Sequence, residues 1–259
     1  MLIHFGKKNF IPMSDLDTWL NIAKSAALSG GQYLLENQGD NLEILLKSGR
    51  DIKLQIDTDT EKLIINMINA HSSFAILGEE TGLSNELGEM YWVVDPLDGT
   101  SNYLRNIPIS CVSIALMKNL TPILGVIYDF NHDDLYFGHQ DSKAFLNNRE
   151  INVSDHSQKM QSTLVTGIPA KTNYSDDEFK EMIDDFQNWK KVRMIGSAAM
   201  ASIYVAAGKA ETYKENGIFL WDIAAGAAIV NSAGGTASIT NFQSDYRVDA
   251  IFTNQHLAN

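Results

Sequence analysis

The sequence predicts a mixed fold in two halves: an antiparallel sheet with helices packed on it, followed by an α/β half. In the first half, apolar strand-like runs follow one another directly over residues 109–138, which favours antiparallel pairing. In the second half, strand and helix patterns alternate from residue 163 onward. We therefore expect an N-terminal α+β domain over residues 1–146 and a C-terminal α/β domain over residues 147–259.

The chain begins with a segment that has no clear period. We expect residues 1–12 to form an arm or an extra turn. Apolar residues then recur at helical spacing from Asp15 to residue 35, which predicts a long amphipathic helix. Residues 42–46 and 51–56 alternate enough to predict two short strands around a turn.

A second helix is expected over residues 58–70. Apolar side chains again recur at helical spacing, with Glu61 and Lys62 on the outer side. Either Asp57 or Thr58 is suited to be its N-cap, because a short polar side chain can accept from the free N–H groups there.

The most informative stretch follows an apolar run at residues 91–94, whose aromatic and β-branched side chains are typical of a buried strand. The run stops at Asp95. Because Pro96 lacks an N–H, we expect the strand to end there and a rigid turn to hold Asp95 near Asp98. Two close carboxylates repel each other unless a cation is shared, and carboxylate oxygens suit Mg²⁺. The turn therefore predicts a magnesium site, although either Asp-Pro or Asp-Gly alone would indicate only a loop.

Two neighbouring features extend this prediction. The small residues after Asp98, beginning with Gly99 and Thr100, are typical of a helix start, where free N–H groups can hold a phosphate oxygen. A short strand at residues 74–77 ends at Glu79 and Glu80, so this acidic pair is also suited to a site at the sheet edge. Most such pairs are solvated surface residues.

The remaining elements follow the same reasoning. Strands at 109–117, 123–128 and 134–138 predict a meander, in which Cys111 is a buried thiol without chemistry. A glycine at Gly196 precedes a helix, a junction that can admit a ligand but is weak evidence by itself. Further strands are expected at 163–167, 192–195 and 210–213, and helices at 175–189, 201–207 and 223–233, the last rich in small residues.

The composition narrows the choice of partners and compartment. The formal net charge of −12 over 259 residues argues against a nucleic-acid or anionic-membrane partner, which would need clustered Lys and Arg. Cys111 is the only cysteine, so no intramolecular disulfide can form, and no basic segment leads into a long apolar stretch at the N-terminus. A cytoplasmic protein is the simplest expectation.

Three motifs in this order resemble the inositol monophosphatase family of Mg²⁺-dependent, lithium-sensitive phosphatases. They are Gly78-Glu79-Glu80, Asp95-Pro96-Leu97-Asp98-Gly99-Thr100 and Trp221-Asp222-Ile223-Ala224-Ala225-Gly226. The resemblance covers nearly the whole chain. It implies a layered αβαβα sandwich, a Mg²⁺ site between the halves, hydrolysis of a small phosphate monoester without a phosphoenzyme, and a homodimer.

The resemblance also implies two or three Mg²⁺ ions and their ligands. Glu79, Asp95 and the carbonyl of Leu97 would hold one ion, Asp95, Asp98 and Asp222 a second, and a third would lie beside Glu79. One ion lowers the pKa of an attacking water, and another stabilises the leaving oxygen.

The same resemblance assigns the catalytic residues Glu79, Thr100 and Asp57. Thr100, hydrogen-bonded to Asp57, would orient the water together with Glu79. The backbone N–H groups of Gly99 and Thr100 would bind the phosphate.

The substrate is argued from the far end of the pocket, where Gly196, Ala198 and Glu215 match positions that line the polyol end in inositol phosphatases. Inositol monophosphate is therefore the expected substrate. Residues 51–56 and Asn148 differ from the usual family pattern, so a phosphatase for adenosine 3′,5′-bisphosphate or histidinol phosphate stays open. A non-catalytic metal-binding regulatory module is less favoured, because metal binding alone would need neither Asp57 nor Thr100.

Overall fold

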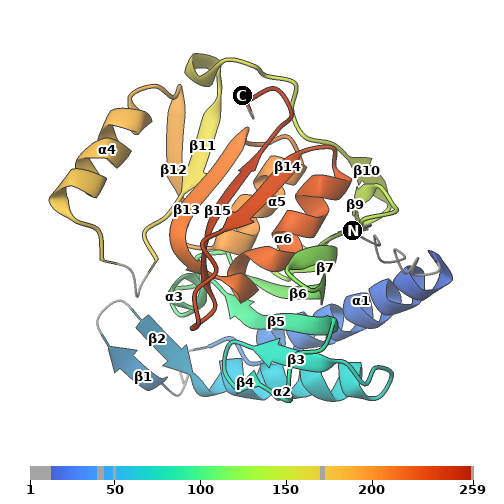
Figure 1. Ribbon diagram of the computed structural model, residues 1–259. Coiled ribbons are helices and arrows are strands. Elements are labelled where there is room, and N and C mark those ends of the chain that lie inside the picture. The colour runs from blue at the N-terminus through green and yellow to red at the C-terminus, as the bar shows by residue number, and fades with distance from the viewer. Residues whose placement is uncertain (1–12, 40–43, 49–50, 170–172, 258–259) are drawn as a thin grey trace, which may run out of the picture.

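A computed structural model describes residues 13–39, 44–48, 51–169 and 173–257, so the expected arm at residues 1–12 lies outside it. Within the described ranges, an eight-stranded sheet has the order β10-β9-β8-β7-β6-β5-β3-β4 (Figure 1). Its strands are β3 (Ala75–Gly78), β4 (Gly82–Leu83), β5 (Met90–Asp98), β6 (Cys111–Lys118), β7 (Thr121–Asp129), β8 (Asp134–His139), β9 (Ala144–Leu146) and β10 (Arg149–Ile151).

Most neighbours in this sheet are antiparallel, as the consecutive strand patterns predicted. β6, β7 and β8 form the expected meander, β5 pairs antiparallel with β6, and only the described pair β3 and β5 is parallel. The expected domain boundary at residue 146 falls inside the β9–β10 hairpin, so the first sheet continues to Ile151.

The second sheet has five described strands in the order β12-β11-β13-β15-β14. β11 pairs parallel with β12 and β13, and β15 pairs antiparallel with β13 and β14. The strands are β11 (Thr163–Thr166), β12 (Lys191–Met194), β13 (Thr212–Phe219), β14 (Thr236–Thr240) and β15 (Arg247–Thr253). β13 extends six residues beyond its expected end because a register shift between Asn216 and Ile218 lets pairing with β15 continue past Gly217.

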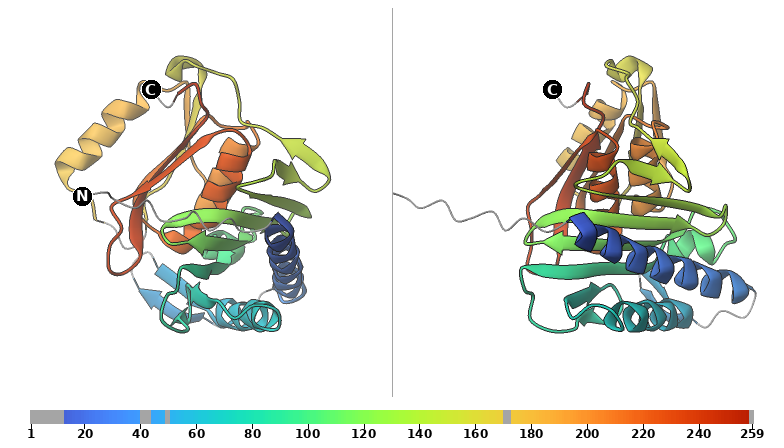
Figure 2. Two further views of the ribbon diagram at one scale, coloured as in Figure 1. Left: turned by 45° about the vertical axis from the view of Figure 1, so that its right-hand side comes forward. Right: turned by 90° about the vertical axis from the view of Figure 1, so that its right-hand side faces the viewer.

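Helices cover both sheets and fill the space between them. The helices α1 (Met13–Glu36) and α2 (Gln55–Asn69) cover the outer face of the first sheet, and α5 (Ala198–Ala206) and α6 (Leu220–Ser232) lie between the sheets. Figure 2 shows the same order from two other sides. The acidic helix α4 (Asp176–Phe186) lies outside the second sheet, which completes the predicted αβαβα sandwich. The other described elements are the hairpin β1 (Ile44–Ser48) and β2 (Asp51–Leu54), the helix α3 (Thr100–Tyr103) and the 3₁₀ turn η1 (Lys159–Gln161).

Two apolar cores explain why β5 reads as a continuous hydrophobic run. Successive side chains of a strand point to opposite faces, so Trp92 and Val94 pack toward α1 and α2, whereas Tyr91 and Val93 pack toward α5 and α6. All four side chains are buried.

The prediction that β5 ends at Pro96 is wrong. The strand continues to Asp98, because the ladder pairs Asp95 with Ser113 and Asp98 with Cys111, which leaves one extra residue on β5. This bulge accommodates a residue that has no N–H to donate, and it turns the two aspartates toward the same site.

The predicted start of the second helix is also wrong. α2 begins three residues early, at Gln55, so Asp57 stands in the first turn, where its carboxylate accepts from the backbone N–H of Leu54 at 2.9 Å. Glu61 was expected on the outer side, but it lies one turn after Asp57 and is fully buried. Helical spacing alone could not predict this burial, because it results from a tertiary contact between Glu61 and the turn after β3.

The helices between the sheets pack closely because their contacting residues are small. A Cβ at Gly125 of β7 would overlap the carbonyl oxygen of Ala225 of α6, so the sheet meets the helix backbone directly. A Cβ at Gly226 would likewise overlap the side chain of Ser202 of α5. The small-residue pattern of α6 is thus a consequence of its position between two layers.

None of the helices within the described residues has the length and apolar character needed to cross a membrane.

Candidate active site

A cleft of about 230 Å³ lies where the ends of β3 and β5 meet the N-termini of α5 and α6. Every predicted site residue except Asp57 lines it, although these residues come from both halves of the chain. Those residues are Glu79, Asp95, Leu97, Asp98, Gly99, Thr100, Gly196, Ala198, Glu215 and Asp222. The described residues of its wall include no Lys, Arg or His.

Three carboxylates form the centre of the cleft. Asp95, Asp98 and Asp222 each offer one oxygen, and these oxygens lie within 4.8 Å of one another; among the described residues, this is the one group with such geometry. Asp222 stands in the first turn of α6, and its carboxylate accepts from the N–H of Phe219 at 3.3 Å. Oxygen ligands at this spacing fit a hard divalent cation such as Mg²⁺.

The electrostatics of the cluster also fit a cation. Burial, followed by the charges of Glu79, Asp98 and Asp222, raises the pKa of Asp95 well above its usual range. Burial and the charges of Asp98, Glu79 and Glu215 raise the pKa of Asp222 in the same way. A divalent ion would remove this repulsion, because it favours the ionised form of every carboxylate around it.

Asp98 joins the cluster to the second half of the chain. One oxygen, Oδ2, accepts from the Ser197 hydroxyl at 2.5 Å and from the Ala199 N–H at 2.7 Å, both at the start of α5. Burial raises the pKa of Asp98 to about 6, although these hydrogen bonds act in the opposite direction.

Thr100 makes a different hydrogen bond from the expected one. Its hydroxyl donates to the carbonyl of Leu97 at 3.1 Å rather than to Asp57. Thr100 is the first residue of α3, so this carbonyl three residues earlier is its nearest local acceptor. Asp57 is buried outside the cleft wall.

Gly99 sets the geometry of this turn. Its φ is +90°, in the left-handed region, and a Cβ there would lie 2.7 Å from the carbonyl oxygen of Ile109. Only glycine fits both constraints.

Glu215 lies at the other end of the cleft, on β13, and is buried. Burial raises its pKa to about 8, the Tyr213 hydroxyl partly offsets the effect, and the charge of Asp98 adds to it. At neutral pH the side chain is therefore mostly protonated, so it can both donate to and accept from a hydroxyl group.

Sequence reasoning did not identify the residues that hold the cleft together. Ser197, which follows Gly196, was not singled out. Asn102 was not singled out either, but its side-chain amide donates to the carbonyls of Ile109 and Ile195, each at 2.8 Å. The contact with Ile195 joins segments 93 residues apart, so no local pattern could reveal it.

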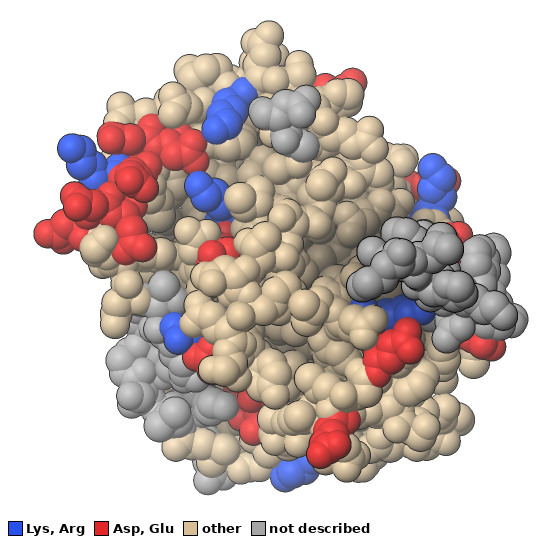
Figure 3. All heavy atoms as spheres, viewed as in Figure 1, with Lys and Arg blue, Asp and Glu red and all other residues tan. Residues whose placement is uncertain are grey.

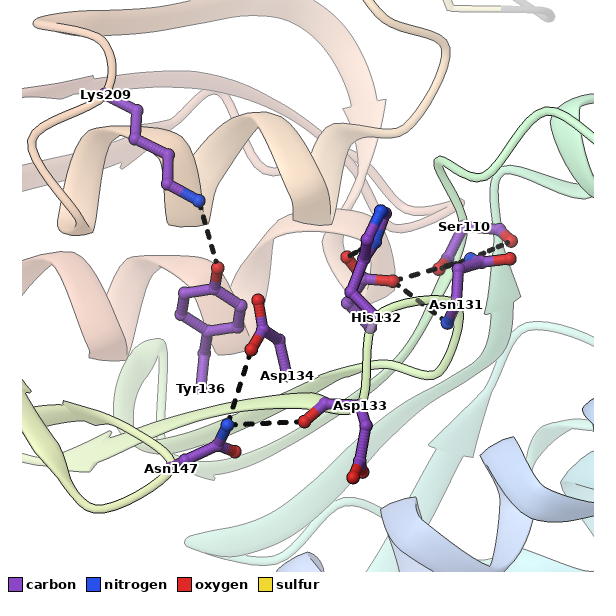
Figure 4. Close-up of polar contacts among 9 residues, drawn as sticks. Ser110, Asn131, His132, Asp133, Asp134, Tyr136, Asn147 and Lys209 are labelled. Atoms are coloured by element: carbon purple, nitrogen blue, oxygen red, sulfur yellow. Dashed lines mark hydrogen bonds and ion pairs between the residues drawn. The ribbon is translucent and has the colours of Figure 1, made fainter.

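A second polar cluster lies outside the cleft, in the turn between β7 and β8 (Figure 4). Buried Asp129 accepts from the N–H of Asn131 at 3.1 Å and lies 2.8 Å from Nδ1 of His132. The amide of Asn131 donates to the carbonyl of Ser110 at 3.1 Å. These bonds all lie between the turn and the residue that precedes β6, so we assign the cluster a structural role.

The model of the inositol monophosphatase family matches residues 15–255. The chain is 39% identical over 220 residues to a protein of Xylella fastidiosa named "Nus factor SuhB", with 83% of this chain and 80% of the relative covered. It is 36% identical over 238 residues to the "Inositol-1-monophosphatase" of Synechocystis sp., with coverages of 90% and 83%.

A solved structure has the same fold. The inositol monophosphatase from Anabaena (Nostoc) sp. matches with a TM-score of 0.81 at 34% identity, with 93% of this chain and 92% of that chain covered.

Proposed function

The chain belongs to the inositol monophosphatase family and is a phosphoric monoester hydrolase, and we propose that its substrate is inositol monophosphate and its cofactor Mg²⁺. The observation that carries the proposal is the group of Asp95, Asp98 and Asp222 in one cleft, in which Asp95 is buried and the other two are half-buried. Three carboxylates in a cleft whose described wall residues include no Lys, Arg or His suit divalent ions better than any apolar or anionic ligand.

We assign the ligands as the resemblance implies. Glu79, Asp95 and the carbonyl of Leu97 would hold one ion, Asp95, Asp98 and Asp222 would hold a second, and a third would lie beside Glu79. Their shared place in the cleft wall supports this assignment. When bound, magnesium supplies the positive charge that acidifies an attacking water and stabilises the leaving oxygen.

The chain itself positions the reactants. Glu79 and Thr100 orient the attacking water, and the N–H groups of Gly99 and Thr100 bind the phosphate. Asp57, the third catalytic residue of the resemblance, accepts from the N–H of Leu54 at the start of α2. Partial burial of the acid cluster strengthens charge interactions at the site, because the effective dielectric falls where solvent is excluded.

The polyol group is assigned to the end of the cleft formed by Gly196, Ala198 and Glu215. A protonated Glu215 offers both a donor and an acceptor, which suits a ring that carries several hydroxyl groups.

Phosphate release tests the proposal with Mg²⁺ and a panel of inositol 1-phosphate, adenosine 3′,5′-bisphosphate, histidinol phosphate and fructose 1,6-bisphosphate. We expect the highest kcat/KM with inositol 1-phosphate. A higher kcat/KM with another substrate would show that this end of the cleft binds a group other than inositol. Full activity in a chelator would overturn the metal assignment. Protein carrying Asp98→Asn, prepared in the same way, controls for contaminating phosphatases.

We also propose a homodimer and inhibition by lithium, both from the family resemblance. Light scattering of the purified protein and turnover in lithium chloride test these two properties. A monomer, or turnover unchanged by lithium, would contradict them.

A second candidate function is an association with nucleic acid. It comes from the name of the Xylella fastidiosa relative, "Nus factor SuhB", which is 39% identical to this chain. A direct nucleic-acid partner does not suit this chain. Its formal net charge is −12, and Figure 3 shows, on the face that it draws, acidic side chains gathered over α4 while Lys and Arg are scattered. We expect no saturable binding when RNA is titrated at low salt and followed by fluorescence anisotropy. Saturable binding would restore nucleic acid as a partner.

A further inference from the structure

The Glu61 carboxylate on α2 is fully buried, although the sequence predicted it on the outer side of its helix. Carboxylates are rarely buried without strong hydrogen bonds or a cation, because desolvation of the charge is costly. What Glu61 binds therefore indicates why the chain keeps it there.

Both oxygens of Glu61 bind the backbone of the turn after β3. Oε2 accepts from the N–H of Glu80 at 2.9 Å, and Oε1 accepts from the N–H of Thr81 at 2.8 Å. Two hydrogen bonds to one carboxylate fix the orientation of the turn as well as its position, and bonds to a charged acceptor are the stronger kind.

Gly78 provides the space for this contact. A Cβ at Gly78 would lie 2.5 Å from Oε2 of Glu61, so the carboxylate rests against the strand backbone itself. The glycine before the acidic pair is thus explained by Glu61, since its substitution would displace the carboxylate.

Glu79 lies between these anchored points. Its own N–H donates to the carbonyl of Val94 at 3.1 Å, next to Asp95 on β5, and the following two N–H groups are held by Glu61. The side chain of Glu79 lines the cleft together with Asp95.

We propose that Glu61 is a positioning residue for the metal site: it fixes the turn of residues 79–81 so that the Glu79 carboxylate is directed toward Asp95. The proposal rests on the proposed function, in which Glu79 is a metal ligand. Glu61 itself touches neither substrate nor ion, because it lies outside the cleft wall. Supporting groups of this kind set the affinity of a metal site by holding its ligands in place.

Glu61→Gln is the appropriate test, since the amide keeps the shape of the carboxylate but replaces one acceptor with a donor that faces an N–H group. Glu211→Gln is the matched control. Glu211 is also buried, its oxygens accept from the N–H of Thr163 and the hydroxyl of Ser154, and it lies outside the cleft wall. A merely structural Glu61 should behave like Glu211.

Two quantities are measured on the full chain: unfolding by denaturant in a chelator, and Mg²⁺ binding by titration calorimetry. We expect both Gln variants to lose stability, but only Glu61→Gln to weaken Mg²⁺ binding, by about tenfold or more. Gly78→Ala should weaken it in the same direction, and it replaces Glu61→Gln if that variant does not fold. Mg²⁺ affinity equal to that of Glu211→Gln would overturn the proposal.

Glu79→Gln distinguishes the role of Glu79 as a metal ligand from the role of Glu61 in positioning it. If Glu79→Gln weakens Mg²⁺ binding and Glu61→Gln does not, the positioning role is wrong and the metal assignment stands. If Glu79→Gln also leaves the affinity unchanged, Glu79 is not a ligand, and both the assignment and the inference that rests on it are wrong.

Discussion

Asp98 combines two roles that are usually separate. Its carboxylate belongs to the acid cluster, and its Oδ2 also accepts from the Ser197 hydroxyl and from the Ala199 N–H at the start of α5. A substitution at this residue therefore tests ligation and folding together.

We predict that Asp98→Asn folds but lowers kcat by about three orders of magnitude or more, and each tenfold loss corresponds to about 1.4 kcal/mol of barrier. The amide oxygen can still accept from Ala199, whereas one anionic ligand is lost. Steady-state kinetics with circular dichroism as the folding control checks this. Near-normal turnover with a lower Tm would make Asp98 a structural residue of the turn.

Among single residues, the sequence indicated the carboxylates of the acid cluster but not the residues that hold them in place. Asp95 and Asp98 were found because they are neighbours in the chain after an apolar run. Asp222 was found only through the family resemblance, and Ser197 and Glu61 were missed because their partners lie 99 and about 20 residues away.

The N-terminus of α5 connects element structure with the site. Ser197 is its N-cap, and the same hydroxyl accepts from the N–H of Met200 and donates to Asp98. Ser175 caps α4 in a similar way, accepting from the N–H of Glu178, but lies outside the cleft wall. The chain thus contains its own matched pair of caps.

We predict that Ser197→Ala and Ser175→Ala each lower the free energy of unfolding by about 1 kcal/mol, the typical value of an N-cap. Only Ser197→Ala should also lower kcat/KM, because it alone removes a donor from Asp98. Denaturant unfolding and kinetics on both variants check this. Equal activities would reduce Ser197 to a cap.

Element types were predictable where a period was long, as in α1, and where several strands followed in sequence, as in the meander. Element ends were not. β5 passes through Pro96 because a bulge absorbs the missing N–H, and α2 begins before Asp57 because the carboxylate can serve from the first turn. In both cases pairing and capping partners outweighed a local signal.

At the scale of the whole molecule, the acid cluster makes the metal-free fold sensitive to pH. Asp95, Asp98 and Asp222 would ionise near pH 4 in the unfolded chain, whereas burial raises their pKa values in the folded protein, to about 6 for Asp98. The folded state then binds more protons, so its stability decreases as pH rises through this range.

We therefore predict that the Tm measured in chelator falls further below the Tm measured with Mg²⁺ as the pH rises from about 4 through about 6. The Mg²⁺-induced increase in Tm should grow with pH, since ligands must release protons to bind a metal. Scanning calorimetry across this range checks it, and Asp98→Asn should show a weaker dependence. An Mg²⁺ effect that is constant with pH would contradict the prediction.

The layered architecture followed from the two halves and the resemblance, but the contact between layers did not. α6 was predicted as a helix of small residues, yet nothing local indicated that its backbone would lie against Gly125 of β7. Ala225 stands three residues after Asp222 on α6, so we expect this contact to set how far Asp222 lies from the two aspartates of β5.

The contact between Gly125 and Ala225 has a genetic consequence. In a saturation library selected for phosphatase activity, position 125 should tolerate no replacement, although it lies outside the cleft. We predict that Gly125→Ala displaces α6 and with it Asp222. Activity is then lost although no residue that lines the cleft has been substituted. An active Gly125→Ala enzyme would contradict this. A mutational map of this protein should therefore show positions that tolerate no substitution along the contact between α6 and β7, away from the substrate cleft.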